Sequence, residues 1–341
     1  MTQPEAKHDW YDVKDMGVEG KGWTETKSYY DRLPAKAEGV VRDVVWQLSR
    51  QPAGLCASFE TDATQIRARW ELESAGLNWP RMAEIAFSGL DLYAMDPAGR
   101  WRWAGASPNV GSRTPEAVLL ETIEPKPHRY RVYLPIANPV LRVEIAVPKG
   151  ATFTPIKPRT ARPIVFYGTS ICHGYCAARS GMPHAMILGR RLDRPIINLG
   201  FAGNALMEPE IGDLLAELDP AIFVIDPIPN MEAKLIQERA EPFVRKLREA
   251  RPRTPIVLVA ARPYTNSWIR QSGRIQDETR SAAFRAAYER LVASGLTGLC
   301  YVPGEHLFGD DGEASMDSSH PSDLGFMRMA DSLEPVLRSL L

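Results

Sequence analysis

The sequence is short of cysteine and has no long hydrophobic run. Only four cysteines occur in 341 residues, too few for a disulfide framework in a chain of this length, so we expect free thiols. The first ten residues lack an apolar core of signal-peptide length, and no later stretch approaches a membrane span. These absences predict a cytoplasmic protein that has no membrane partner.

The sequence also lacks an excess of charge of either sign. Its 41 basic and 42 acidic residues give a formal net charge of −1, which is not typical of proteins that bind nucleic acid or an anionic membrane surface. Hydrophobic residues make up 44% of the chain, and its length is sufficient for two hydrophobic cores. We therefore expect a globular protein with no nucleic-acid partner.

The first part of the chain, residues 1–150, has the pattern of an antiparallel β-sandwich. Apolar and polar side chains alternate, as in strands that are buried on one face. Asp96-Pro97-Ala98-Gly99 favours a turn and predicts a hairpin between two of these strands. Short strands without intervening helices favour a sandwich of the jelly-roll kind. The expected strands are residues 55–59, 66–72, 90–95, 101–103, 130–134 and 140–147.

The second part, residues 163–341, alternates apolar runs with helical stretches, and the proline-rich residues 151–162 before it are typical of a stiff linker. This alternation predicts a five-stranded, mostly parallel sheet with helices on both faces. The expected strands are residues 164–167, 196–199, 222–225, 256–260 and 299–302, and the expected helices are 186–192, 209–218, 234–250, 279–293 and 323–340.

Polar residues follow four of the expected parallel strands. Ser170 follows the first, Gly203 the second, Asn230 the third, and Asp317 and His320 the fifth. Because ligands bind at the carboxyl ends of parallel strands, we expect these residues to meet at one edge of the sheet. A serine hydroxyl, an imidazole base and a carboxylate that orients the base are the groups that nucleophilic catalysis needs.

Four segments resemble the motif blocks of the SGNH/GDSL hydrolase superfamily, in that family's order. The resemblance covers nearly all of residues 163–341, and a subgroup with an N-terminal β-sandwich and a GTSI-type first block would extend it over most of the chain. It implies a flavodoxin-like three-layer α/β/α domain and ester hydrolysis without a cofactor. The segments are Tyr167-Gly168-Thr169-Ser170-Ile171, residues 198–204, Pro229-Asn230-Met231 and Asp317-Ser318-Ser319-His320-Pro321.

The resemblance also implies a role for each block. Ser170 would be the nucleophile, although Gly-Thr-Ser stands where the wider family has Gly-Asp-Ser. His320 would be the base, and Asp317 would fix its tautomer. The oxyanion hole would consist of the N–H groups of Ser170 and Gly203, the glycine allowing a close approach of the backbone, and the Asn230 amide. Asn230 stands in Ile-Pro-Asn-Met, which departs from the family's commoner Gly-x-Asn-Asp.

Each of these residues also has a structural alternative. Gly203 can serve a turn between strand and helix, Asn230 can cap a helix, and Asp317 with His320 can form a local turn. Four independent turns at one sheet edge, in family order, favour the catalytic interpretation.

A second cluster invites a metal hypothesis. It consists of Cys172, His173, Cys176 and His184, near the expected nucleophile. Cys-x₃-Cys with a single later histidine lacks the paired spacing of zinc sites, and a metal there would share the nucleophile loop. We favour packing of the loop over metal binding and expect no metal.

Two arginines and several tryptophans are candidates for substrate contact. Arg179 and Arg262 lie on loops near the same sheet edge, where a guanidinium could bind a carboxylate or a sugar hydroxyl; solvation at the surface is the alternative. Tryptophans of the first part could stack on sugars, or form core. They are Trp46, Trp70, Trp79, Trp101 and Trp103.

The sequence therefore predicts a serine esterase that acts on a small-molecule or oligosaccharide ester. The resemblance implies removal of small acyl groups, acetyl foremost, from a hydroxylated substrate such as a carbohydrate, since we find no amphipathic lid of the long-chain lipase kind. Two alternatives stay open: an esterase or thioesterase for other small acyl compounds, and a non-catalytic carbohydrate-binding protein. The sugar, the linkage position and the oligomeric state are also open.

Overall fold

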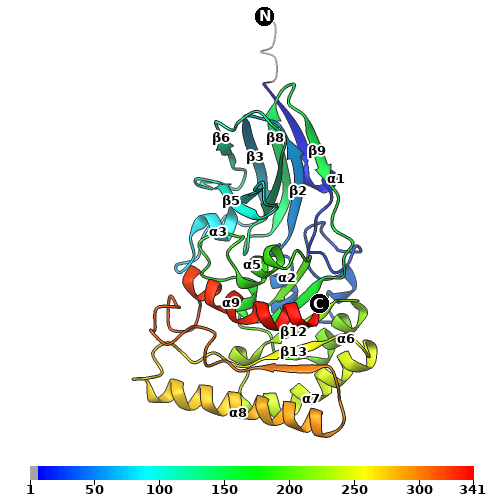
Figure 1. Ribbon diagram of the computed structural model, residues 1–341, viewed down its shortest axis with the longest axis vertical. Coiled ribbons are helices and arrows are strands. Elements are labelled where there is room, and N and C mark those ends of the chain that lie inside the picture. The colour runs from blue at the N-terminus through cyan, green and yellow to red at the C-terminus, as the bar shows by residue number, and fades with distance from the viewer. Residues whose placement is uncertain (1–6) are drawn as a thin grey trace, which may run out of the picture.

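The computed structural model describes residues 7–341, so the first six residues of the predicted sandwich segment lie outside the description. Figure 1 shows a β-sandwich at one end of the molecule, and below it a second sheet enclosed by helices. The strands of the sandwich lie within residues 8–156, and the strands of the second sheet lie within residues 164–302. The fold is thus an antiparallel sandwich followed by an α/β domain.

Two antiparallel sheets form the sandwich, one in the order β1-β8-β3-β6 and the other in the order β5-β4-β7-β2-β9. Every second residue of β3 is buried, as the alternation in the sequence predicts. The strands are β1 (His8–Asp12), β2 (Cys56–Thr61), β3 (Gln65–Leu72), β4 (Asp91–Met95), β5 (Trp101–Ala106), β6 (Glu116–Glu121), β7 (His128–Tyr133), β8 (Val140–Pro148) and β9 (Phe153–Ile156), and the short helix α3 (Glu84–Ser88) precedes β4.

Strands β1, β6 and β9 differ from the sequence prediction. Strand β9 lies inside the predicted linker, residues 151–162, and pairs antiparallel with β2. Pro155 hid this strand in the sequence, but β9 is at the sheet edge, where a residue without an N–H is tolerated. The ring of Phe153 stacks on Tyr11 of β1, with 3.9 Å between the ring centroids. The linker prediction is therefore corrected: residues 153–156 belong to the sandwich.

Part of the N-terminal segment packs on the second domain. This segment contains α1 (Val13–Met16), the 3₁₀ turn η1 (Ala35–Ala37) and α2 (Asp43–Ser49). Val45 and Trp46 belong to the same hydrophobic cluster as Tyr167 of the parallel sheet. Arg32 is 1% exposed and donates to the carbonyl groups of Asn198 and Gly200, at 2.8 and 3.0 Å. The segment between β1 and β2 thus stabilises the second domain.

The second domain is a five-stranded sheet in the order β11-β10-β12-β13-β14, with every pair parallel. This is the flavodoxin-like order 2-1-3-4-5, which places ligands at the carboxyl ends of the strands. Its elements are β10 (Ile164–Gly168), α4 (Ser170–His173), α5 (His184–Arg191), β11 (Ile196–Gly200), α6 (Pro209–Glu217), β12 (Ile222–Asp226), η2 (Ile228–Asn230), α7 (Ala233–Ala250), β13 (Ile256–Val259), α8 (Gln271–Ala293), β14 (Leu299–Val302) and α9 (Asp323–Leu340).

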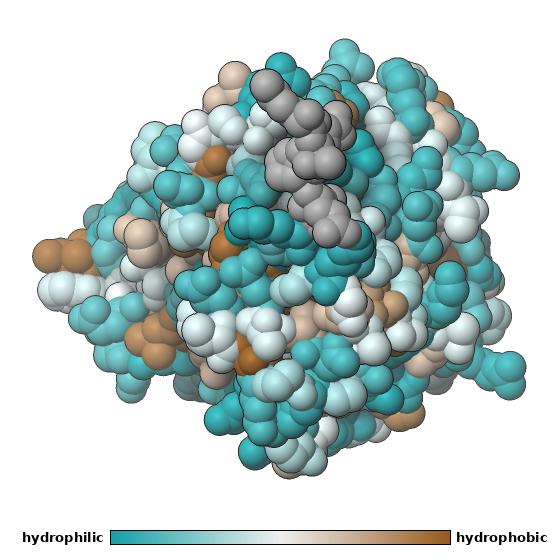
Figure 2. All heavy atoms as spheres, turned by 90° about the horizontal axis from the view of Figure 1, so that it is seen from above, coloured by the Kyte–Doolittle hydropathy of each residue, from teal (hydrophilic) through white to brown (hydrophobic). Residues whose placement is uncertain are grey.

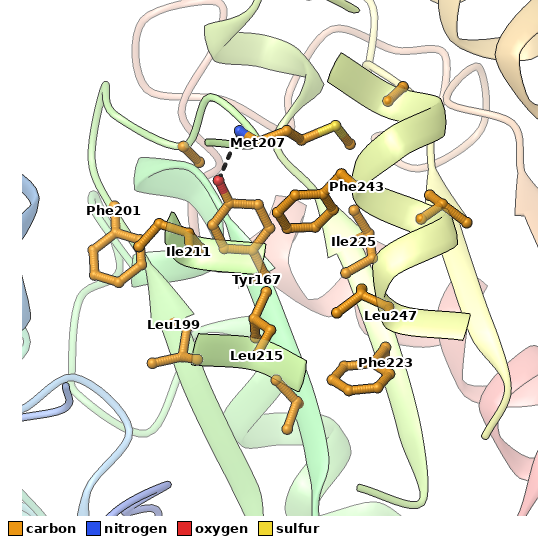
Figure 3. Packing of buried hydrophobic residues seen from close by; sticks show 14 of the residues in the cluster. Tyr167, Leu199, Phe201, Met207, Ile211, Leu215, Phe223, Ile225, Phe243 and Leu247 are labelled. Atoms are coloured by element: carbon orange, nitrogen blue, oxygen red, sulfur yellow. Dashed lines mark hydrogen bonds between the residues drawn. The ribbon is translucent and has the colours of Figure 1, made fainter. Parts of the chain in front are cut away.

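Helices cover both faces of this sheet. On one face, Val165 and Tyr167 pack with α6, α7 and α8; on the other, Ile164 and Phe166 pack with α5 and α9. Figure 3 shows the first face, where the Tyr167 ring stacks on Phe243 with 5.3 Å between centroids. The buried Tyr167 hydroxyl accepts a hydrogen bond from Met207 N at 2.9 Å, which ties the end of β10 to the loop after β11.

The sandwich also packs directly on the α/β domain. Cys56, Tyr93 and Tyr133, from the outer face of one sandwich sheet, share a hydrophobic cluster with residues of α5. Seen from the sandwich end, the surface is mostly hydrophilic, with hydrophobic residues scattered over it (Figure 2). Within residues 7–341, no helix is both long enough and apolar enough to cross a membrane.

Candidate active site

Ser170 lies at a sharp turn between strand and helix. Strand β10 ends at Gly168, and Thr169 caps α4 by accepting from the N–H of Ile171 at 3.2 Å. A Cβ on Gly168 would lie 2.8 Å from the carbonyl oxygen of Asp226, so the tight turn needs glycine here. Ser170 is 8% exposed, and its Oγ lies 2.8 Å from Nε2 of His320.

His320 and Asp317 come from the loop between β14 and α9. Nδ1 of His320 lies 2.9 Å from Oδ2 of Asp317, while Oδ1 accepts from the backbone N–H groups of His320 and Ser319 at 2.8 and 3.1 Å. Burial opposes ionisation of Asp317, but these donors together lower its pKa to about 2. Asp317 and His320 thus form the local turn that was the structural alternative. Their side chains also form a series of hydrogen bonds that ends at Ser170.

Gly203 and Asn230 lie on two neighbouring loops. Gly203 has φ +69°, a conformation that favours glycine, but a Cβ on it would meet nothing within 4 Å. The expected close approach of the Gly203 backbone concerns a bound substrate and stays a prediction. Gly200 is needed for packing, because a Cβ on it would lie 2.2 Å from N of His173. Asn230 Oδ1 accepts from Ala205 N at 3.4 Å, so the two loops are joined.

The three donor groups assigned to the oxyanion hole have no acceptor within the described chain. The N–H groups of Ser170 and Gly203, and the Nδ2 amide of Asn230, make no hydrogen bond within residues 7–341. Asn230 ends a 3₁₀ turn instead of capping a helix with its side chain. These donors can therefore hydrogen bond a ligand.

A loop of the sandwich, between β3 and α3, reaches the same site. The ring of Trp79 lies edge-on to His320 and to Tyr175, with centroid distances of 6.2 and 5.6 Å. Arg81, about half exposed, forms an ion pair with Oδ2 of Asp317 and lies over the Trp79 ring at 5.4 Å. Sequence reasoning missed Arg81, because only the packing of the two domains places residue 81 beside residue 317.

Arg179 is held by residues of the sandwich. Its Nη1 lies 3.0 Å from both carboxylate oxygens of Asp91 and 3.3 Å from the Tyr93 hydroxyl, and its guanidinium lies over Trp103 at 5.0 Å. Asp91 is fully buried and also accepts from the backbone N–H of Gly181 at 2.9 Å. The prediction of substrate binding is corrected: Arg179 joins the two domains.

Arg262 is also committed to the protein interior. Its guanidinium makes three contacts of 2.5–3.1 Å with the Asp226 carboxylate, and the two side chains are 1% and 2% exposed. Such a group cannot reach a substrate without breaking a buried ion pair. The predicted substrate contact of Arg262 is therefore corrected to a structural ion pair beneath the site.

The cysteines and histidines of the metal hypothesis are not brought together. Cys172 lies against Asn198, with Sγ 3.8 Å from the amide oxygen, and His173 Nε2 lies 3.2 Å from the carbonyl of Ile136. His184 is buried between Phe166 and Phe326, and burial lowers its pKa to about 3. Within residues 7–341 no three potential metal ligands are grouped.

The tryptophans divide into core and surface. Trp46 and Trp70 are 5% and 2% exposed and lie in two different hydrophobic cores. Trp101 and Trp103 each carry an arginine over the ring. Of these five tryptophans, only Trp79 has a ring contact with the Ser170–His320–Asp317 site, through the His320 ring.

Family comparison decides the classification. Residues 161–338 match the GDSL-like lipase/acylhydrolase family, and residues 8–153 match a family described as the N-terminus of SGNH-hydrolase-type esterases. The chain belongs to the GDSL-like lipase/acylhydrolase family. Its chemistry is hydrolysis of ester bonds, as the resemblance implied. The search of curated proteins gives no match.

Solved structures of similar fold cover nearly the whole of this GDSL-like hydrolase. A protein from Bacteroides ovatus assigned as a GDSL-like lipase is 30% identical, with TM-score 0.93 and 98% of both chains covered. A salicylyl-acyltransferase, SsfX3, from a tetracycline biosynthetic pathway is 17% identical, with TM-score 0.75 and 98% and 97% covered. A family two carbohydrate esterase from Cellvibrio japonicus is 13% identical, with TM-score 0.62 and 98% of both chains covered. The last two show the fold alone.

The name of the N-terminal family, GxDLY, points to a signal that we missed. Gly89-Leu90-Asp91-Leu92-Tyr93 fits this pattern in our GDSL-like hydrolase. In the structure, Asp91 and Tyr93 are the residues that hold Arg179. The pattern therefore marks the junction between the sandwich and the loop that follows Ser170.

Proposed function

We propose that this protein is a serine esterase that removes small acyl groups, acetyl foremost, from a carbohydrate through an acyl-enzyme on Ser170. The observation that carries the proposal is the chain of hydrogen bonds from Ser170 Oγ to His320 Nε2 at 2.8 Å and from His320 Nδ1 to Asp317 Oδ2 at 2.9 Å. A serine hydroxyl is a weak nucleophile until a neighbouring imidazole accepts its proton, and this geometry supports that transfer.

The proposed reaction has two steps. Ser170 Oγ attacks the ester carbonyl as its proton passes to His320, whose imidazolium is stabilised by Asp317. The alkoxide that forms on the carbonyl oxygen accepts from Ser170 N, Gly203 N and the Asn230 amide. His320 then donates the proton to the leaving alcohol, and a water molecule, deprotonated by His320, releases the acid and regenerates Ser170.

Trp79 supports a carbohydrate as the alcohol part of the substrate. Its half-buried indole lies beside the base, 6.2 Å from the His320 ring centroid. Indole rings offer a flat apolar surface with a polar edge, which suits a sugar ring. Arg81 beside it presents a half-exposed guanidinium, a donor for sugar hydroxyls. The carbohydrate esterases among the similar folds are consistent with this choice.

The test is release of acetate from acetylated xylo-oligosaccharides, measured beside hydrolysis of p-nitrophenyl acetate and butyrate. We expect acetate release that is lost in Ser170→Ala, and a Trp79→Ala variant whose KM rises for the oligosaccharide but not for p-nitrophenyl acetate. Faster turnover of an acyl thioester than of either ester would favour the thioesterase alternative. Sugar binding without turnover by the wild-type protein would favour the non-catalytic one.

A further inference from the structure

A cavity separate from Ser170 lies where the sandwich meets the α/β domain. Its volume is about 210 Å³, and its walls come from the outer face of the β5-β4-β7-β2-β9 sheet, the segment after β9 and the turn before β11. In Figure 1, β2 and β9 lie side by side above this junction. The wall residues are Gly17, Glu19, Cys56, Ser58, Met95, Trp101, Arg129, Arg131, Ile156, Lys157, Pro158, Arg159 and Asp193.

Arg131 of β7 is the unusual residue of this cavity. It is 4% exposed, and its Nε donates to Ser58 Oγ at 3.3 Å. Its guanidinium lies over the Trp101 ring, 4.4 Å from the centroid. Within residues 7–341, no carboxylate lies within 4.0 Å of the Arg131 guanidinium, so this buried cation has no ion-pair partner.

The nearest carboxylate is already used. Glu19 Oε1 and Oε2 accept from Nη2 and Nε of Arg159, at 2.5 and 2.9 Å, and Oε2 also accepts from the Arg159 backbone N–H. The charged wall residues are the cations Arg129, Arg131, Lys157 and Arg159 and the anions Glu19 and Asp193, which both pair with Arg159. Because Arg129 also pairs with Glu60 outside the wall, one positive charge remains in excess. Burial of an unpaired charge is costly, and such charges persist in proteins chiefly where a partner completes them.

We propose that this cavity binds a small organic carboxylate, with the carboxylate paired to Arg131 and the organic body against Trp101 and Met95. One excess charge matches a monoanion, and the planar guanidinium matches a carboxylate. The apolar walls, with Ile156 and Pro158, favour an organic body over a bare inorganic ion. Cavities of about 150 Å³ hold a benzene ring, so about 210 Å³ admits one ring with its carboxylate. The proposal does not depend on esterase activity.

The test measures binding to the full chain by thermal unfolding and by tryptophan fluorescence. Benzoate and glucuronate are compared with their uncharged counterparts benzamide and glucose, at equal ionic strength. We expect at least one carboxylate to raise the wild-type unfolding temperature by roughly 2–5 °C at a hundredfold excess over its Kd, and to change Trp101 emission. The uncharged counterparts should have less than a quarter of this effect.

Two variants locate the site. Arg131→Met removes the charge and should abolish the carboxylate effect, whereas Arg67→Met, on the other sheet and paired with Glu116 at the surface, should keep it. If Arg131→Met does not fold, Trp101→Leu, which keeps the charge, should weaken binding about tenfold or more. Wild-type protein that responds to neither carboxylate, an equal response of Arg131→Met, or a stronger response to inorganic phosphate would each overturn the proposal.

Discussion

Replacing Arg262 with leucine separates a structural role from substrate binding. The Asp226 carboxylate hydrogen bonds only to Arg262 within the described chain, through three contacts of 2.5–3.1 Å. Both side chains are at most 2% exposed, so solvent cannot replace the lost guanidinium. Removing one partner of a buried ion pair costs about 3–5 kcal/mol. We expect Arg262→Leu to lower the free energy of unfolding by about that amount at pH 8.

The loss of stability caused by Arg262→Leu should depend on pH. Burial raises the pKa of Asp226 to about 6, above its ordinary value, with Arg262 opposing the rise. A carboxyl group whose folded pKa is raised contributes stability below its unfolded pKa and loses it as the pH rises through the folded value. Without Arg262 the folded pKa rises further, so the difference in stability between variant and wild type should be small near pH 4–5. It should grow by up to about 1.4 kcal/mol per pH unit above pH 6, to about 3 kcal/mol at pH 8.

Urea unfolding at several pH values, followed by tryptophan fluorescence, measures both effects. The double variant Asp226→Leu/Arg262→Leu is the matched control, because an apolar pair of similar volume should come within about 1 kcal/mol of the wild type. In the folded single variant, KM should stay within a few-fold of the wild-type value. An Arg262→Leu protein with wild-type stability and a KM raised tenfold or more would refute the structural assignment.

Three further predictions concern the residues around Ser170. Asn230→Ala should lower kcat about 10²–10³-fold with little change in KM, as for loss of one oxyanion donor; an unchanged kcat would remove Asn230 from the mechanism. Asp317→Asn should lower kcat by up to about 10⁴-fold, and because the pKa of Asp317 is held near 2, protonation of Asp317 should not lower the activity of the wild type between pH 7 and 5. Arg81→Gln removes a cation from Asp317, so the acid limb of its pH–rate profile should move up by about 0.5 pH unit; a downward shift would contradict that account.

Much of the fold could be predicted from local pattern. Strands such as β3 alternate strictly between buried and half-buried residues, and β10 is a fully buried run that ends in glycine. The spacing of apolar residues and the residues that end each run were therefore enough to predict these strands. Strand β9 could not be recognised, because Pro155 argues against a strand unless its edge position is known. The packing of Trp46 on the α/β core was hidden because its partners lie far along the sequence.

The site shows the same division. Ser170, Asp317 and His320 follow strands of one parallel sheet, so topology alone brings them to one edge. Arg179 and Arg262 lie near that edge as well, but position cannot reveal that Asp91 and Asp226 already hold them. Arg81 and Trp79 reach the site from the sandwich, and a single sequence has no signal for a contact made by docking two domains.

Labelling by a fluorophosphonate probe tests most directly whether Ser170 is the nucleophile. The probe reacts with a serine that an imidazole has activated, so digestion and mass spectrometry of the labelled protein should find the modification on Ser170. Ester hydrolysis should be lost as labelling reaches completion. Ser170→Ala should stay folded, without labelling or turnover, while Ser339→Ala, on the exposed side of α9, should behave as the wild type. Modification at another serine, or hydrolysis by Ser170→Ala at more than about 1% of the wild-type rate, would contradict the account.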